Sequence, residues 1–248
     1  GAKVLIPVGV EVQVDGVIAA RIATVRVDGT LSFNTTRNTL IQVDTMVVSD
    51  SGTFQMGTQA APIARGVTAK VLFTNNGAID RTWDPYGISR GLIAQGSVSI
   101  YGAQVDSYAN IGGIATVGTQ TLTLKTVPVG WKVGDSVVIA AVTPDTTQNE
   151  TRTISAILGN IVVLDRPLTY DHTPISSAYS VQIANVTRNV VFESEATAFD
   201  RRGHVMFMHN EDVHIGYAGF YRIGRTDKSV PINDPVIQSD WTLKAGTG

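Results

Sequence analysis

The stretch Val25-Arg-Val-Asp-Gly29-Thr-Leu-Ser-Phe33 contains the pattern that decides the fold. Apolar side chains alternate with polar ones on both sides of a central glycine, which is typical of strands with one buried face. Three further copies of the pattern are centred on Gly16, Gly52 and Gly96, with Asp50 as the misfit. The glycine shares the apolar face, where the missing side chain allows a bend or a close backbone approach.

The uneven spacing of these glycines along the chain separates one repeat architecture from another. It excludes a strict solenoid repeat, but it suits an irregular parallel β-helix whose turns carry loops of different lengths. An irregular antiparallel sandwich would show the same alternation of apolar and polar residues. Of these two all-β folds we favour the β-helix.

The composition narrows the class of protein further. Charged residues make up only 16% of the 248 residues, the formal net charge is −2, and 24 residues are glycine. Such a chain is unlike a helical bundle, and it lacks the positive field of a nucleic-acid-binding protein. Cysteine is absent, which excludes disulfides, thiolate catalysis and cysteine-bound zinc. No apolar run reaches the ~18 residues of a membrane span, so we expect no membrane insertion.

Residues 120–178 follow a different pattern from the rest of the chain. The Gly159-Asn160 pair between two alternating segments predicts a tight hairpin, and Trp131-Lys-Val-Gly-Asp135 leads into a further buried strand. We therefore predict a β-helical domain over residues 1–119, a small antiparallel β insert over 120–178, and continuing β-helix rungs over 179–248.

With these elements the chain resembles the eight-glycine-domain family. The resemblance covers nearly the whole chain and rests on the order and spacing of short motifs. These motifs are the glycine-centred strands, Trp131–Asp135, Leu168-Thr-Tyr-Asp-His172, Asn185-Val-Thr-Arg-Asn-Val-Val191 and the run from Gly203 to Gly224. The resemblance implies an extracellular or cell-surface protein, here expected to be a secreted bacterial one. It also implies a right-handed parallel β-helix with an antiparallel insert and, for some members, binding or cleavage of hyaluronan.

Members of this family continue into further turns that carry a His-Phe-His-like motif, whereas this chain stops at Gly248. We therefore expect the chain to be a piece of a longer protein, truncated at its C-terminal side. If catalysis depends on the later turns, the activity belongs to the full-length parent and this chain alone is inactive.

Charged residues concentrate between residues 195 and 228, so we look for a site there first. A hydrolase needs two carboxyl groups, and a lyase needs a base and a cation that neutralises the uronate carboxylate. Histidine titrates near neutrality, and the arginine fork matches the two oxygens of a uronate. The candidate catalytic residues are Asp200, His204, His214 and Asp227, and the candidate substrate-binding arginines are Arg201, Arg202, Arg222 and Arg225.

These residues are compatible with either a hydrolase or a lyase. They also fit an ordinary polar rim on the flank of a β-helix, with the histidines packed at rung ends and arginine–aspartate pairs of little energetic weight. Convergence of Asp200, His204, Arg222 and Asp227 in one groove would favour an enzyme.

Aromatic residues on a polar loop complete the candidate site. Trp83 and Tyr86 lie in such a loop and are candidates for stacking on sugar rings. Trp131 lies in a motif of structural character, so we expect it to be buried.

We expect no cofactor and no metal, because the histidine spacing matches no zinc signature; calcium is the divalent cation that we keep open. The expected partner is an acidic polysaccharide such as hyaluronan, with no nucleic-acid partner, and the protein is expected to be a monomer. The functional hypothesis is an extracellular β-helix that binds this polysaccharide and, in the full-length parent, depolymerises it. The alternative is a non-catalytic adhesin or structural surface module.

Overall fold

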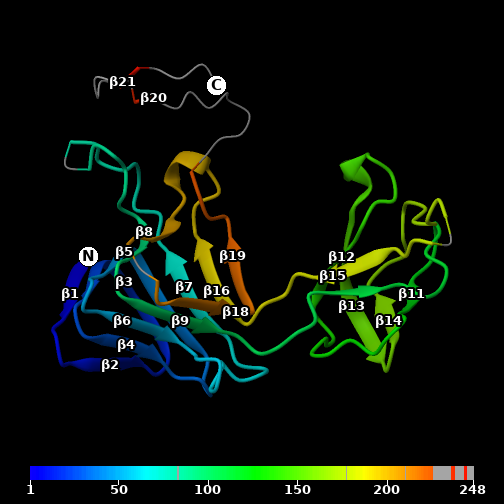
Figure 1. The fold of residues 1–248 in the computed structure, drawn as a ribbon, viewed down its shortest axis with the longest axis horizontal. Coiled ribbons are helices and arrows are strands. Elements are labelled where there is room, and N and C mark those ends of the chain that lie inside the picture. The colour runs from blue at the N-terminus through cyan, green and yellow to red at the C-terminus, as the bar shows by residue number, and fades with distance from the viewer. Residues whose placement is uncertain (83, 177, 210, 226–235, 238–242, 245–248) are drawn as a thin grey trace.

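The computed structural model describes residues 1–82, 84–176, 178–209, 211–225, 236–237 and 243–244. Figure 1 shows two bodies of β-structure, joined by the segments that leave β9 and return to β16. Both bodies are built almost entirely from strands, with two short 3-10 helices, η1 (Thr146–Gln148) and η2 (Phe199–Arg201), among the described residues. A separate two-stranded pair is formed by β20 (Val236–Ile237) and β21 (Leu243–Lys244).

The larger body is a parallel β-helix in which strands stack in three columns. The first column contains the first half of β3 (Val17–Val27), the first half of β5 (Thr39–Val48), β7 (Ala69–Phe73), β16 (Val190–Ser194) and β19 (Ala218–Tyr221). The second contains β1 (Ala2–Ile6), the second halves of β3 and β5, β8 (Gly91–Ala94) and β17 (His204–Phe207). The third contains β2 (Glu11–Val14), β4 (Thr30–Phe33), β6 (Thr53–Met56), β9 (Ser97–Tyr101) and β18 (Val213–Gly216).

The chain visits the three columns in the same order on successive turns, and every pairing between neighbouring turns is parallel. This arrangement confirms the predicted parallel β-helix and removes the antiparallel sandwich as an alternative for the main body. Loops of unequal length connect the columns, which accounts for the uneven glycine spacing.

The repeated glycines mark a corner between the second and third columns. A Cβ built on Gly52 would lie 2.2 Å from the carbonyl oxygen of Val27, and one built on Gly96 would lie 2.1 Å from the carbonyl oxygen of Gly52. Only glycine allows successive rungs to approach this closely. Gly16 departs from the pattern, because a Cβ there would meet nothing within 4 Å.

The core of the β-helix lies inside the three columns, as the alternation predicted. Aromatic rings from different turns contact one another along it: Phe33 lies 5.6 Å from Phe54, Phe54 lies 6.1 Å from Phe192, and Phe192 stacks on Phe220 at 5.2 Å between ring centroids. Phe33, Phe54 and Phe192 are buried, and full burial of one such ring stabilises the fold by about 1.5–3 kcal/mol.

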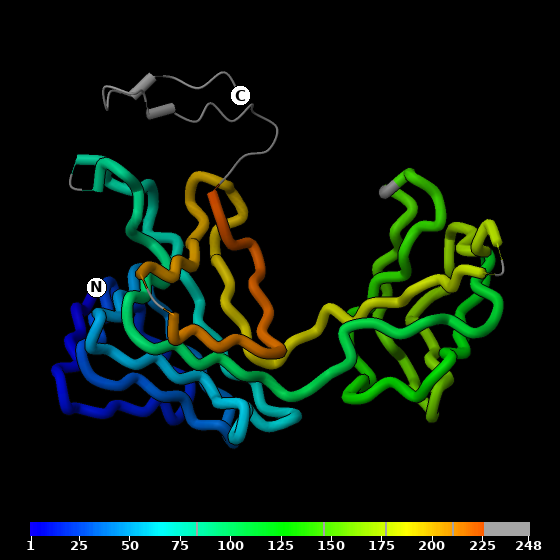
Figure 2. Tube along the Cα trace, in the orientation of Figure 1, coloured from blue at the N-terminus to red at the C-terminus, as the bar shows by residue number. Residues whose placement is uncertain are grey.

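The smaller body is an antiparallel unit with a core of its own. Its strands, in sheet order, are β10 (Tyr108–Asn110), β15 (Gln182–Asn185), β12 (Ser136–Ile139), β13 (Glu150–Leu158), β14 (Ile161–Leu164) and β11 (Thr121–Thr123). A bridge between Ile111 and Leu124 connects the two edges, so the sheet curls back on itself. Figure 2 follows the chain from β9 into this unit and back to β16.

An antiparallel insert is therefore present, with the hairpin turn at Gly159-Asn160 between β13 and β14 as predicted. Its sheet also includes β10 and β15, which lie outside the predicted range of 120–178. Trp131 is buried, as expected, and its indole Nε1 donates a hydrogen bond to the carbonyl oxygen of Asp106 at 2.7 Å. None of the helices in the described residues has the length and apolar character needed to cross a membrane.

Candidate functional site

The predicted site residues come from several strands and loops of the β-helix. His204 begins β17 in the second column, His214 lies in β18 in the third, and Arg222 follows β19 in the first. Asp200 is exposed in η2. Asp227 and Trp83 lie outside the described residues. Arg222 nevertheless lies near His204, because it bonds to Ser194, whose hydroxyl accepts a hydrogen bond from the backbone of Gly203. Since Asp227 is not described, the convergence of the four predicted residues stays a prediction.

Arg225 uses its guanidinium to join two loops. It donates to the carbonyl oxygens of Arg202 and Arg90, each at 2.7 Å, and to those of Gly87 and Ser89. Burial, followed by the nearby charge of Arg90, lowers its pKa. This guanidinium acts as a structural staple, because its donors point at backbone oxygens of its own chain.

Arg90, which the sequence did not single out, forms the second half of this staple. It is buried, pairs with Asp44 at 3.2 Å, and donates to the carbonyl oxygens of Gly77 at 2.8 Å and Arg201 at 3.1 Å. The loop between β7 and β8 is thus fastened to the segment that precedes β17.

Two other predicted arginines are also engaged within the molecule. Arg222 donates to the carbonyl oxygen of Ser194 at 3.0 Å and pairs with Glu193. Arg202 donates to the carbonyl oxygen of Thr197 at 2.7 Å and lies over the ring of Phe199, 4.2 Å from its centroid. These contacts correspond to the polar-rim interpretation of the segment.

The side chain of His204 is half-buried. Both ring nitrogens are buried and have no hydrogen-bond partner. Burial, followed by the charge of Arg225, lowers the pKa of His204. Buried ring nitrogens are poorly placed to exchange a proton with a bound polymer.

Of the remaining predicted residues, His214 and Tyr86 face the solvent. His214 is 61% exposed, and its Nε2 lies 3.1 Å from a carboxylate oxygen of Asp212. Tyr86 is 87% exposed on the loop between β7 and β8, so its ring is available for stacking. Among the residues that the structure describes, no group of three histidine or acidic side chains could hold a metal ion.

A groove lies beneath the loop between β7 and β8, with a volume of about 590 Å³. Asp44 and Asp80 are the carboxylates on its wall. Asp44 already accepts hydrogen bonds from Asn76 and Arg90, and Asp80 accepts one from the backbone N–H of Thr82 at 2.9 Å. These carboxylates are therefore held by the protein itself.

A larger cleft of about 860 Å³ opens where the β-helix meets the antiparallel unit. We call it the junction cleft. It is lined by Gln59, Tyr101, Gln104, Ser107, Arg188 and Tyr217, among others. Sequence reasoning missed these residues, because they come from distant segments that only the return of the chain at β16 brings together.

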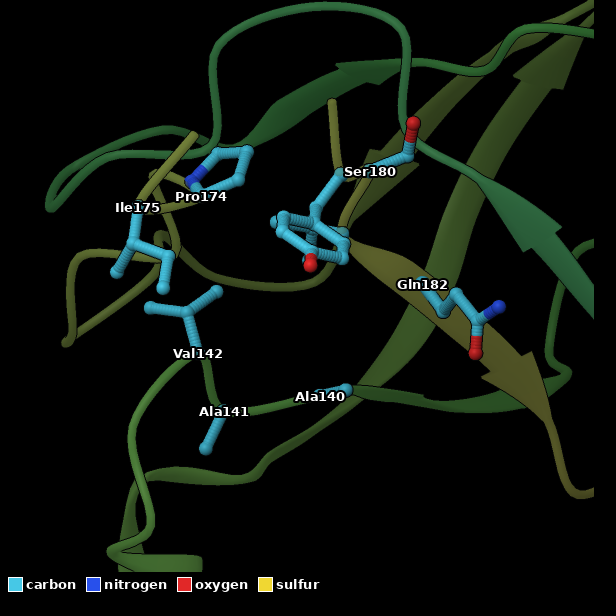
Figure 3. Close-up of a pocket in the computed structure, with 9 residues that line it drawn as sticks. Ala140, Ala141, Val142, Pro174, Ile175, Ser180 and Gln182 are labelled. Carbon is cyan, nitrogen blue, oxygen red and sulfur yellow. The ribbon is translucent and has the colours of Figure 1, made fainter. Parts of the chain in front are cut away.

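A third hollow lies on the antiparallel unit beyond the ends of β12 and β15, with a volume of about 340 Å³. In Figure 3, Val142 and Ile175 face one another across it and Pro174 lies beside Ile175. Its lining carries no acidic or basic side chain. It offers apolar contact rather than acid–base chemistry.

Comparison with known proteins finds a family match over the first part of the chain. Residues 1–111 match the family model of the G8 domain. Fibrocystin-L of Mus musculus is 28% identical over 177 residues, which are 66% of this chain and 4% of that protein. A G8 domain-containing protein of Dictyostelium discoideum is 32% identical over 175 residues, which are 65% of this chain and 15% of that protein. The chain thus spans only a small part of these curated relatives.

Solved structures with partial similarity are bacteriophage tailspikes. Gp54 of Acinetobacter baumannii bacteriophage AP22, in complex with a capsular saccharide, has a TM-score of 0.30 and 14% identity, and the match covers 84% of this chain and 29% of that one. The tailspike gp49 of Pseudomonas phage LKA1 has a TM-score of 0.28 and 14% identity, with 78% and 25% covered. TM-scores this low do not establish a shared fold.

Proposed function

We propose that this chain, whose residues 1–111 match the G8 domain model, is a non-catalytic module of an extracellular or cell-surface protein and binds an acidic polysaccharide such as hyaluronan. G8 domains occur in extracellular and cell-surface proteins such as Fibrocystin-L. The observation that carries the proposal is the contrast between the engaged arginines of the predicted site and the open, polar junction cleft.

Binding fits this geometry better than catalysis. A glycoside hydrolase places two carboxyl groups on either side of the scissile bond, and an elimination needs an accessible base beside a cation. The ring nitrogens of His204 are buried, His214 lies on another column, and the donors of Arg225 are directed at backbone oxygens. The alternative function, a structural spacer without a ligand, would leave the polar clefts without a role.

The proposal is tested by incubating the purified chain with hyaluronan, measuring binding by calorimetry and sizing the polymer by gel electrophoresis. We expect binding with no change in polymer length, and weaker binding to dextran, an uncharged polysaccharide. Shortened hyaluronan would show an enzyme, and an ultraviolet-absorbing unsaturated uronate among its products would identify a lyase. Absence of binding to either polymer would support the spacer.

A further inference from the structure

We propose that the junction cleft is the site that holds the acidic polysaccharide, with Tyr217 as its stacking platform and Arg188 as its cation. Arg65 and Lys132, in an adjoining hollow, extend the positive charge. This inference rests on the proposed function and assigns it to a place in the molecule. The volume of about 860 Å³ lies within the ~300–1,000 Å³ range of small-molecule sites, so a short run of sugar units fits.

The two tyrosines of the cleft are held by the backbone around them. Tyr217 is 38% exposed and adopts a left-handed conformation with φ +55°, which is strained for a residue other than glycine. Its carbonyl oxygen lies against Gly102, where a Cβ would come within 2.3 Å. A Cβ on Gly216 would lie 2.8 Å from the ring of Tyr101, so that glycine makes room for the ring.

A strained aromatic residue at the rim of a cleft is a feature that packing alone does not require. Glycine would fit this corner without strain, as Gly57 does at φ +80° after β6. Backbone strain of this kind gathers at ligand-binding sites, where the fixed side chain is useful. The ring of Tyr217 presents a flat apolar face with a polar tip, which suits the mixed surface of a sugar.

Free hydrogen-bonding groups surround the tyrosines. The side-chain amides of Gln59 and Gln104 line the cleft and have no partner within the described part of the molecule. Each amide can donate and accept at once, which matches hydroxyl and acetamido groups. Ser107 already accepts a hydrogen bond from Arg188 at 3.2 Å and retains its own hydroxyl proton for a ligand.

The charge of this region is positive. A second hollow shares Gln104 and Arg188 with the junction cleft and adds Arg65 and Lys132 to its lining. Within the described residues none of the three cations pairs with a carboxylate. The carboxylate there, Asp135, is buried and accepts a hydrogen bond from Asn185 at 2.8 Å.

Arginine matches a uronate carboxylate with two parallel hydrogen bonds. Arg188 donates through Nη1 to the carbonyl oxygens of Asn185 and Thr187 and through Nη2 to Ser107, which fixes the guanidinium and leaves Nε outside these bonds. Arg65 donates a single bond, from Nη2 to the carbonyl oxygen of Gln104 at 3.0 Å. Both arginines thus keep donors for an anionic ligand.

The decisive variant is Tyr217→Gly, because glycine removes the ring and adopts the left-handed conformation without strain. We expect its affinity for hyaluronan oligosaccharides to fall about tenfold, equivalent to ~1.4 kcal/mol, with an unchanged or higher thermal midpoint. Tyr179→Ala, which removes an exposed ring of the antiparallel unit outside the junction cleft, should bind like the parent chain.

The positive charge beside the cleft is tested with Arg65→Gln. The matched control is Arg37→Gln, at an exposed arginine that pairs with Asp15. We expect Arg65→Gln to weaken binding and to reduce its salt dependence, and Arg37→Gln to change neither. If the parent chain binds hyaluronan and all four variants bind equally well, the cleft assignment is wrong while the proposed function stands. If the parent chain does not bind, both are wrong.

Discussion

Gly52 and Gly16 hold the same place in the sequence pattern but differ in what surrounds them. A Cβ at Gly52 would lie 2.2 Å from the carbonyl oxygen of Val27, whereas nothing lies within 4 Å of one at Gly16. Because overpacking costs about 1–3 kcal/mol, we expect Gly52→Ala to lower the free energy of unfolding by about 3 kcal/mol. Gly16→Ala should leave it unchanged or raise it by ~0.5 kcal/mol, since alanine restricts the unfolded chain. Urea denaturation compares the two, and equal losses would contradict the corner role.

His204 makes the stability of the β-helix depend on pH, because its ring nitrogens are buried. Burial, and then the charge of Arg225, lowers its pKa below the ordinary value of 6.5 in the folded state. The unfolded chain therefore binds the proton more readily, and stability falls as pH drops below 6.5 toward the folded-state pKa. We expect the thermal midpoint to decline between about pH 7 and pH 5, and His204→Gln to flatten that decline. An identical decline in the variant would assign it to other groups.

The sequence could identify which residue types concentrate in the segment from Asp200 to Arg225, but not what each one touches. Arg225 bonds to the carbonyl oxygens of Gly87 and Ser89, which are more than a hundred residues away in the chain. Backbone acceptors leave no trace in the sequence. An arginine that staples two loops and an arginine that binds a uronate look the same until the fold is known.

At the level of elements, β13 contributes a buried network of charged side chains to the core of the antiparallel unit. Glu150 and Arg152 both lie on the buried face of β13 and form an ion pair. The Nε2 atom of His172 lies 3.0 Å from a carboxylate oxygen of Glu150. Burial alone would raise the pKa of Glu150, but hydrogen bonds from the backbone of Tyr170, from His172 and from Thr169 lower it from 4.5 to about 2. The carboxylate therefore stabilises the fold above its ordinary pKa, and that contribution is lost as pH falls toward 2.

We expect Glu150→Gln to lower the free energy of unfolding by about 3 kcal/mol near neutral pH, because it leaves Arg152 buried without its counter-charge. The variant should also lose part of the acid dependence between about pH 5 and pH 2. Glu11→Gln, at an exposed position of β2, is the matched control and should change neither quantity. If Glu150→Gln left the free energy of unfolding unchanged, other acceptors would satisfy the buried guanidinium of Arg152.

The loop between β7 and β8 is fastened by the guanidinium of Arg225 together with that of Arg90. Replacing the guanidinium by an ammonium in Arg225→Lys removes the planar fork that reaches several carbonyl oxygens at once. We expect amide hydrogen exchange over residues 84–90 to speed up about tenfold, with exchange in β5 and β7 unchanged. Arg166→Lys, at an exposed arginine beside Asp165, is the control. Unchanged exchange in the Arg225 variant would show that other contacts hold the loop.

The limits of the antiparallel unit show why element boundaries were harder to predict than element types. The Gly159-Asn160 pair predicts a hairpin from adjacent residues alone, and the structure has that turn. In contrast, β10 and β15 are strands of three and four residues that pair with each other across more than seventy residues of chain. A strand this short shows little alternation, and its partner is fixed only when the unit closes.

For the whole molecule, the sequence predicted the repeating half of the structure and missed the place where the two halves meet. The alternation around Gly29, Gly52 and Gly96 repeats the same contact in each turn, so every copy reinforces the prediction. The junction cleft occurs once. It depends on the direction in which the chain leaves β9 and returns to β16, which no local pattern encodes.

The two bodies have separate cores, and this separation has a consequence for unfolding. The buried cluster of the β-helix contains Val27, Phe54 and Phe192, and that of the antiparallel unit contains Leu122, Ile139 and Ile183, with no buried residue shared between them. If the antiparallel unit unfolds, it leaves a long loop between β9 and β16, and the entropy of closing a loop grows only slowly with its length. The β-helix can therefore remain folded.

We expect calorimetry to show two transitions, with Glu150→Gln lowering the temperature of one and Gly52→Ala that of the other. The pair of variants assigns each transition, because Glu150 belongs to β13 and Gly52 to a corner of the β-helix. A single transition that both variants lower equally would mean that the contacts at the junction couple the cores. In that case hyaluronan bound in the junction cleft would stabilise both bodies together. With independent cores, the cleft is lost when the less stable body unfolds, so hyaluronan should raise the midpoint of that first transition.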